Sequence, residues 1–120
     1  MAPEITYDPK LDVVHVKYSG TLNNETGMAI AKKAVSVSAQ QKCDKILFDY
    51  RKTDFKESTL GIYQNPKIAV KEGIPRSVKI AVVYSTDETL HLFWETVTIN
   101  SGYIAKCFKT EDKAITWLKE

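Results

Sequence analysis

The sequence has few of the residues and motifs from which common cofactor sites are built. It contains two cysteines and two histidines in 120 residues, with no CxxC pair and no Cys/His cluster, so it offers no visible zinc site. It has neither GxGxxG nor GxxxxGK[ST], which argues against a glycine-rich phosphate loop. It also lacks a GxSxG elbow, so a serine nucleophile has no supporting context. We therefore expect no metal, no cofactor and no enzymatic activity.

An excess of one charge sign and long apolar runs are also absent. Seventeen basic and fifteen acidic residues give a net charge of +2, too weak a balance to indicate nucleic-acid binding. No apolar run approaches the length of about 20 residues that spans a membrane, and the first residues lack the pattern of a signal peptide. We expect a cytoplasmic protein in which Cys43 and Cys107 are free thiols.

Five short segments have the composition of β-strands, with β-branched and aromatic residues between turn-forming ones. They are residues 5–7, 13–18, 45–50, 78–84 and 103–108. An Asp8-Pro9 turn joins the first two into a hairpin, and Ser19-Gly20 is expected to end the second strand. The third segment is apolar on both faces, so we expect it near the centre of the sheet.

Four other segments have the caps and spacing of amphipathic helices. They are residues 24–40 after Asn23, a segment from Phe55 that Pro66 is expected to break, a segment after residues 85–88, and residues 114–118 after Thr110. Alternating strands and helices indicate a parallel sheet. The chain therefore predicts one α/β domain over residues 1–120, a mixed five-stranded sheet with an antiparallel N-terminal hairpin, the remaining strands parallel, and about four helices.

The order of these elements resembles the SpoIIAA-like proteins of the STAS superfamily. The resemblance rests on the hairpin, Ile46-Leu47-Phe48-Asp49, Lys79-Ile80-Ala81-Val82-Val83 and the ending Cys107-Phe108-Lys109-Thr110-Glu111-Asp112-Lys113-Ala114-Ile115-Thr116-Trp117-Leu118. It implies a STAS-like domain, in a group whose better-known members antagonise anti-sigma factors or regulate anion transporters. Those antagonists carry an Asp-Ser-Ser-Gly-Leu-type motif with a phosphorylated serine. Glu57-Ser58-Thr59-Leu60-Gly61 stands at that place, so the resemblance implies Ser58 as phosphoacceptor; an ordinary helix cap is the alternative.

Three further groups of residues are candidate sites. In open sheets, ligands bind outside the carboxyl ends of parallel strands, which here is expected to bring together Asp49, Arg51, Ser85, Thr86 and Asp87. They would bind an anion or a partner, or serve only as caps. His91 and Glu95, four residues apart, are expected to form a surface ion pair. Phe93 and Trp94 are adjacent and point about 100° apart on a helix, so they cannot both face the centre of the sheet. Core packing is the default for these aromatic residues, and an exposed Trp94 with Ile62 and Tyr63 would mark a subunit or partner surface.

These observations favour a non-enzymatic regulatory domain that binds a protein partner or a small ligand, with a homodimer left open. One alternative is a carrier of a hydrophobic ligand or lipid, with its pocket under the helices that bear Ile62, Tyr63, Phe93 and Trp94. The other is an enzyme that uses the strand edge around Asp49.

Overall fold

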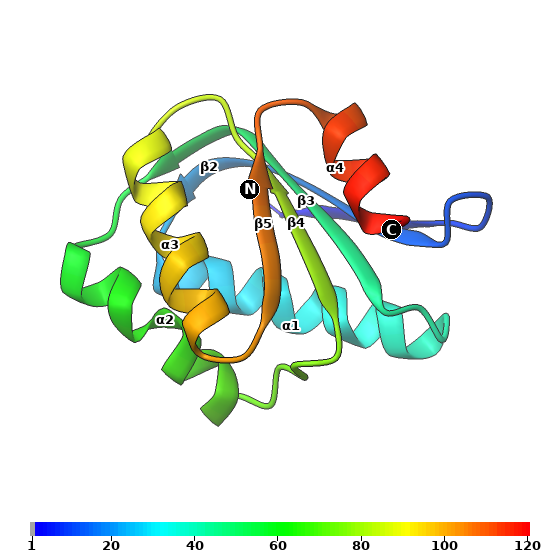
Figure 1. Cartoon of the computed structure of the whole chain (residues 1–120), viewed down its shortest axis with the longest axis horizontal. Coiled ribbons are helices and arrows are strands. Elements are labelled where there is room, and N and C mark those ends of the chain that lie inside the picture. Colours follow the sequence, from blue (N-terminus) through cyan, green and yellow to red (C-terminus); the bar gives the residue numbers. More distant parts are fainter. Residues whose placement is uncertain (1) are drawn as a thin grey trace.

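The fold is known from a computed structural model that describes residues 2–120. Its elements are β1 (Glu4–Asp8), β2 (Val13–Leu22), α1 (Asn24–Gln40), β3 (Lys45–Phe55), α2 (Thr59–Lys71), β4 (Lys79–Val83), α3 (Glu88–Asn100), β5 (Ile104–Phe108) and α4 (Glu111–Leu118). The strands form one sheet in the order β1-β2-β3-β4-β5. β1 is antiparallel to β2 and the other pairs are parallel (Figure 1). This confirms the predicted mixed sheet with four helices.

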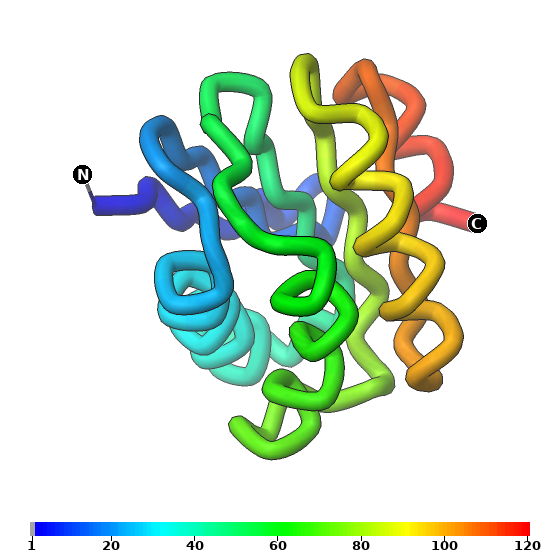
Figure 2. Tube along the Cα trace, turned by 90° about the vertical axis from the view of Figure 1, so that its left-hand side faces the viewer, coloured from blue at the N-terminus to red at the C-terminus, as the bar shows by residue number. Residues whose placement is uncertain are grey.

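Alternating side chains of the strands build a separate core on each face of the sheet. Ile46, Phe48 and Tyr50 point to the face covered by α1, α2 and α3. Leu47 points to the other face, where α4 packs through Ala114 and Leu118. Figure 2 shows α1, α2 and α3 next to one another in front of the sheet, with α2 between the other two. Three helices therefore lie over one face and one short helix over the other.

β2 and β3 run further than predicted. Ser19-Gly20 does not end β2, and residues 51–54 continue β3 instead of leaving it as a polar loop. The backbones of the two strands stay paired up to Leu22 and Phe55. Backbone pairing does not require apolar side chains, so exposed polar residues continue the ladder once a partner strand lies alongside. Gly20 has φ +127°, a conformation that L side chains rarely adopt, which fits its place just after a register shift.

The predicted break at Pro66 is also wrong. α2 is one helix from Thr59 to Lys71, with Ser58 as its N-cap, and it does not begin at Phe55. Proline in a helix interior removes one backbone hydrogen bond and usually bends or ends the helix. Here Pro66 is fully buried, so its ring is packed against the core. The expected helix after Asn23 is confirmed, and Asn23 and Thr26 cap each other reciprocally.

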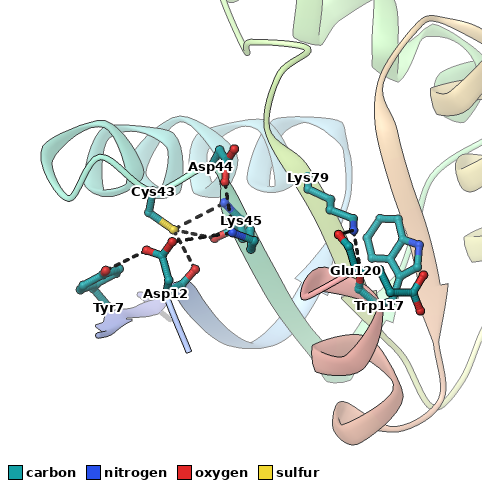
Figure 3. Close-up of polar contacts among 8 residues, drawn as sticks. All are labelled: Tyr7, Asp12, Cys43, Asp44, Lys45, Lys79, Trp117 and Glu120. Carbon is teal, nitrogen blue, oxygen red and sulfur yellow. Dashed lines mark hydrogen bonds and ion pairs between the residues drawn. The ribbon is translucent and has the colours of Figure 1, made fainter. Parts of the chain in front are cut away.

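The C-terminal helix is held by a lysine at the amino end of β4 (Figure 3). The Lys79 ammonium donates to the Trp117 carbonyl at 2.6 Å and to the Glu120 carbonyl at 3.2 Å. It also lies 4.5 Å from the centroid of the Trp117 ring. A cation is favourable at the carboxyl end of a helix, where carbonyl groups lack partners. The tail is thus docked, through a fully buried Leu118 and a half-buried Trp117.

Cys43, the first of the two cysteines, lies in a polar cluster just before β3 (Figure 3). The Cys43 thiol donates to the Asp12 carbonyl at 3.2 Å, and the Tyr7 hydroxyl donates to the Asp12 carboxylate at 2.8 Å. Cys43 and Cys107 are both free and buried, as predicted. Burial raises the pKa of the Cys43 thiol, so it is a poor nucleophile and acts as a packing residue.

Candidate functional site

The carboxyl edge of the sheet holds the polar residues that the sequence predicted there, but they are paired with one another. The Arg51 guanidinium donates to both Asp49 carboxylate oxygens, at 2.9 and 2.7 Å, and lies 3.7 Å from Glu111. These hydrogen bonds from Arg51 hold the pKa of Asp49 below its usual range. Arg51 already has a bidentate carboxylate partner, which occupies part of its donor capacity and balances its charge.

The other three predicted edge residues finish the ends of the strands. The Ser85 hydroxyl donates to the Arg51 carbonyl at 2.5 Å. The Asp87 carboxylate accepts the Phe55 N–H at 3.1 Å, and Thr86 donates to it at a longer 3.4 Å. Asp87 precedes α3 with φ +61° and gives that helix no side-chain cap. These hydrogen bonds satisfy backbone groups where strands and loops end, which is the capping role considered for these residues.

A second polar site lies where α1 and α2 begin. The Glu57 carboxylate accepts the Asn24 N–H at 2.8 Å and the Ser58 N–H at 3.2 Å. The Ser58 hydroxyl is exposed and accepts the Gly61 N–H at 3.0 Å, which makes it the N-cap of α2. A Cβ on Gly61 would overlap the Glu57 carboxylate. One carboxylate thus joins two helix amino ends, where negative charge is favourable.

A cavity lies between the sheet and the helices α1, α2 and α3. Its volume is about 100 Å³. Its walls are mostly apolar, and none of the lining side chains is Asp, Glu, Lys or Arg. Six of them are aromatic or imidazole rings, namely Phe48, Tyr50, Phe55, His91, Trp94 and Tyr103. A mostly apolar cavity with a few polar groups has the composition of a small-molecule site.

His91 is one of these lining residues, which contradicts the predicted surface ion pair. Its side chain is 3% exposed, with the ring centroid 4.8 Å from that of Phe55 and 5.0 Å from that of Tyr84. Burial lowers the pKa of His91 from 6.5 to about 4, so the ring is neutral at pH 7. The Glu95 carboxylate instead accepts the Cys107 N–H of the edge strand at 2.6 Å. This hydrogen bond satisfies the Cys107 backbone N–H on the edge strand β5.

The four residues predicted as an interface do not share one surface. Ile62 is fully buried, Phe93 and Trp94 are half-buried, and Tyr63 is 48% exposed. Ile62 and Trp94 line the cavity. Only Tyr63 faces solvent, and on the same helix it is accompanied by the exposed Leu60 (64%) and Val70 (42%). Residues 60, 63 and 70 have helical spacing, so they form one stripe, here named the α2 stripe.

A chain of side-chain hydrogen bonds, which the sequence did not predict, ties the three helices together over the cavity. The Trp94 indole N–H donates to the Asn65 amide oxygen at 2.9 Å, and the Asn65 amide nitrogen donates to the Asn24 amide oxygen at 2.9 Å. The Asn24 amide nitrogen donates to the Gly61 carbonyl at 2.8 Å. All three side chains line the cavity. We call this chain of Trp94, Asn65 and Asn24 the helix bridge.

Within residues 2–120, no group of three or more His, Cys, Asp or Glu residues is placed to hold a metal ion. In the same part of the chain, no helix has the length and apolarity needed to cross a bilayer.

The architecture is a SpoIIAA-like fold, as two similar solved structures show. The chain is similar to an anti-sigma factor antagonist from Mycobacterium paratuberculosis, with a TM-score of 0.61 and 18% identity over 99% of this chain and 94% of that one. It is also similar to an uncharacterized DUF3478-family protein with a SpoIIAA-like fold from Shewanella loihica PV-4. That match has a TM-score of 0.53 and 20% identity over 98% and 92% of the two chains. No protein-family model and no curated protein matches the sequence. The fold expected from the resemblance is therefore confirmed.

Proposed function

We propose that this protein is a non-enzymatic regulatory domain that binds a protein partner through the α2 stripe. The observation that carries the proposal is the exposure of Leu60 (64%) and Tyr63 (48%) immediately after the exposed Ser58. Large apolar side chains gathered on one exposed helix face are typical of a binding surface. Aromatic residues such as Tyr63 are frequent among the residues that dominate binding energy. The fold shared with an anti-sigma factor antagonist supports a regulatory role of this kind.

We further propose that Ser58 is the position at which this binding is controlled by phosphorylation. Its hydroxyl is exposed at the amino end of α2, beside Leu60. A phosphate there would be favoured by the helix dipole and repelled by the Glu57 carboxylate, which accepts the Ser58 N–H at 3.2 Å. Glu57 also accepts the Asn24 N–H. Modification would therefore disturb the junction of α1 and α2 as well as the charge of the surface.

The partner test compares two double variants in extract from the source organism. Leu60→Asp/Tyr63→Asp places charge on the α2 stripe, and Leu92→Asp/Ile99→Asp is the matched control on α3, where both residues are also exposed (41% and 48%). Affinity capture with quantitative mass spectrometry should show one protein whose captured amount falls at least about tenfold with the α2 variant. The control variant should capture that protein as the native chain does. If no captured protein depends on the α2 stripe, the proposal is wrong.

Two further measurements test whether the partner is a second copy of the chain and whether Ser58 is phosphorylated. Light scattering that shows a dimer for the native protein and a monomer for Leu60→Asp/Tyr63→Asp would make the partner a second copy of the chain. Intact mass after incubation with extract and ATP should show one added phosphate on the native protein and none on Ser58→Ala. No added phosphate under any condition would remove Ser58 as a switch while leaving the partner surface untouched.

A lipid carrier receives less support than a binding domain. The cavity of about 100 Å³ is well below the roughly 300–1,000 Å³ of sites for drug-sized ligands. An enzyme at the strand edge also receives little support, because the Asp49 carboxylate is neutralised by Arg51. The cytoplasmic location stays a prediction.

A further inference from the structure

We propose that the cavity under α1, α2 and α3 is a binding site for a neutral, single-ring molecule that carries one hydrogen-bonding group. This site lies inside the helix layer, whereas the α2 stripe lies on the outside. The inference therefore goes beyond the partner-binding function and does not depend on it. It rests on the size of the cavity, the absence of charged side chains in its walls, and the buried, unpaired Thr98 hydroxyl among its lining residues.

The volume limits the ligand to about one ring. An apolar cavity of about 150 Å³ in another protein binds benzene, and the cavity here measures about 100 Å³. Phe48, Tyr50, Phe55 and Trp94 line it, and aromatic walls contact a flat ring favourably in stacked or edge-on arrangements. The smaller volume here sets an upper limit of about one ring on the ligand and excludes an acyl chain.

The electrostatics of the walls exclude a charged ligand. No lining residue is Asp, Glu, Lys or Arg. Burial raises the pKa of Tyr50 and lowers that of His91 to about 4, so both side chains are neutral at pH 7. A charged molecule entering this space would lose its hydration without gaining a counter-charge, which is costly. The site thus distinguishes a neutral ring from its ionised isostere.

One lining side chain is buried without a hydrogen-bond partner within the described residues. The Thr98 hydroxyl is buried and unpaired, in a residue that is 3% exposed. Tyr50 and His91 also line the cavity, and burial shifts the pKa of each in the direction that favours its neutral form. Buried polar groups in native proteins are normally paired. A hydroxyl on the ligand could pair with Tyr50 or His91, or with Thr98 after rotation of its side chain.

The helix bridge places a spectroscopic reporter at this site. Trp94 lines the cavity and is one of the two tryptophans in the sequence. The other, Trp117, packs against Phe108, with ring centroids 5.7 Å apart, on the α4 face of the sheet. In the Trp117→Phe protein, indole emission comes from Trp94 alone. Ligand in the cavity then changes that emission directly.

The experiment titrates Trp117→Phe protein at pH 7 with three probes, namely phenol, toluene and benzoate. Phenol should change the Trp94 emission saturably, with one site. Toluene should bind about threefold to tenfold more weakly, as expected for the loss of one hydrogen bond. Benzoate should show no saturable change, because its carboxylate is ionised. Equal binding of phenol and toluene, or of phenol and benzoate, would overturn the assigned ligand chemistry.

A cavity-filling variant with a matched control tests the location. Ala31 on α1 lines the cavity, whereas Ala29 on the same helix is exposed. In the Trp117→Phe background, Ala31→Met should weaken phenol binding at least about tenfold and Ala29→Met should leave it unchanged. Far-ultraviolet circular dichroism verifies that both variants are folded. Unchanged binding by a folded Ala31→Met protein, or no saturable response of the Trp117→Phe protein to phenol, would refute the site.

Discussion

Acid should weaken this fold through one buried histidine. His91 is 3% exposed and its ring lies between those of Phe55 and Tyr84. Burial lowers its pKa from 6.5 to about 4, and the nearby Asp87 charge only partly opposes that shift. In the unfolded chain, His91 returns to its ordinary pKa. Between these two values the unfolded chain therefore binds a proton that the folded chain does not, and stability falls as the pH falls.

The size of this effect follows from the two pKa values. The difference between 6.5 and about 4 corresponds to a loss of up to about 3 kcal/mol in the free energy of unfolding. Roughly 2 kcal/mol of this should be lost by about pH 5. Carboxylates with lowered pKa values, such as Asp49, lose their contribution only as the pH falls below the ordinary carboxyl range. The histidine effect therefore comes first on acidification.

Urea denaturation at several pH values from about 7.5 to 4 measures the effect. The native protein should lose stability steadily below about pH 6.5, whereas His91→Phe, which retains a ring between the two neighbours, should show a much flatter profile. His15→Gln is the matched control, because it removes the other histidine and keeps His91. A native protein whose stability is level between pH 7 and 5, or a His91→Phe protein with the native slope, would refute this account of His91.

Three smaller predictions concern the contacts that hold the helices. Lys79→Met should lower stability by about 1–2 kcal/mol in thermal denaturation, because it removes the cation at the end of α4, whereas the exposed Lys119→Met should change little. Gly61→Ala should destabilise the native protein, because its methyl group displaces Glu57; in a Glu57→Ala background it should be neutral or stabilising. Ser58→Ala should cost about 1 kcal/mol as a lost N-cap and Ser58→Asp much less, with urea denaturation as the measurement.

The elements that the sequence predicted well are those defined by local chemistry. Asn23, Ser58 and Thr110 all cap helices, and a cap is recognised from a few neighbouring residues. The extension of β3 could not be seen in this way. Its polar residues at 52–54 are in a strand because β2 continues alongside them, and such pairing depends on residues far away in the sequence. Pro66 stays in a helix because of its burial, which is likewise a tertiary effect.

The cavity and the helix bridge were invisible for the same reason. Asn65 is 29 residues from Trp94 and 41 from Asn24, and no local pattern shows that α2 lies between α1 and α3. One signal was available. His91, Trp94 and Thr98 lie three and four residues apart, which is the spacing of one helix face, and all three line the cavity. The expected surface ion pair between His91 and Glu95 was wrong because His91 belongs to this buried face of α3.

Photo-crosslinking in living cells of the source organism tests the central claim most directly. A photoreactive amino acid is placed in turn at the exposed positions 60 and 63 on α2 and at the exposed positions 92 and 99 on α3. The account predicts that positions 60 and 63 crosslink to the same protein, whereas positions 92 and 99 do not crosslink to it. Adducts from 92 and 99 alone, or none from any of the four positions, would contradict a regulatory domain that binds its partner through the α2 stripe.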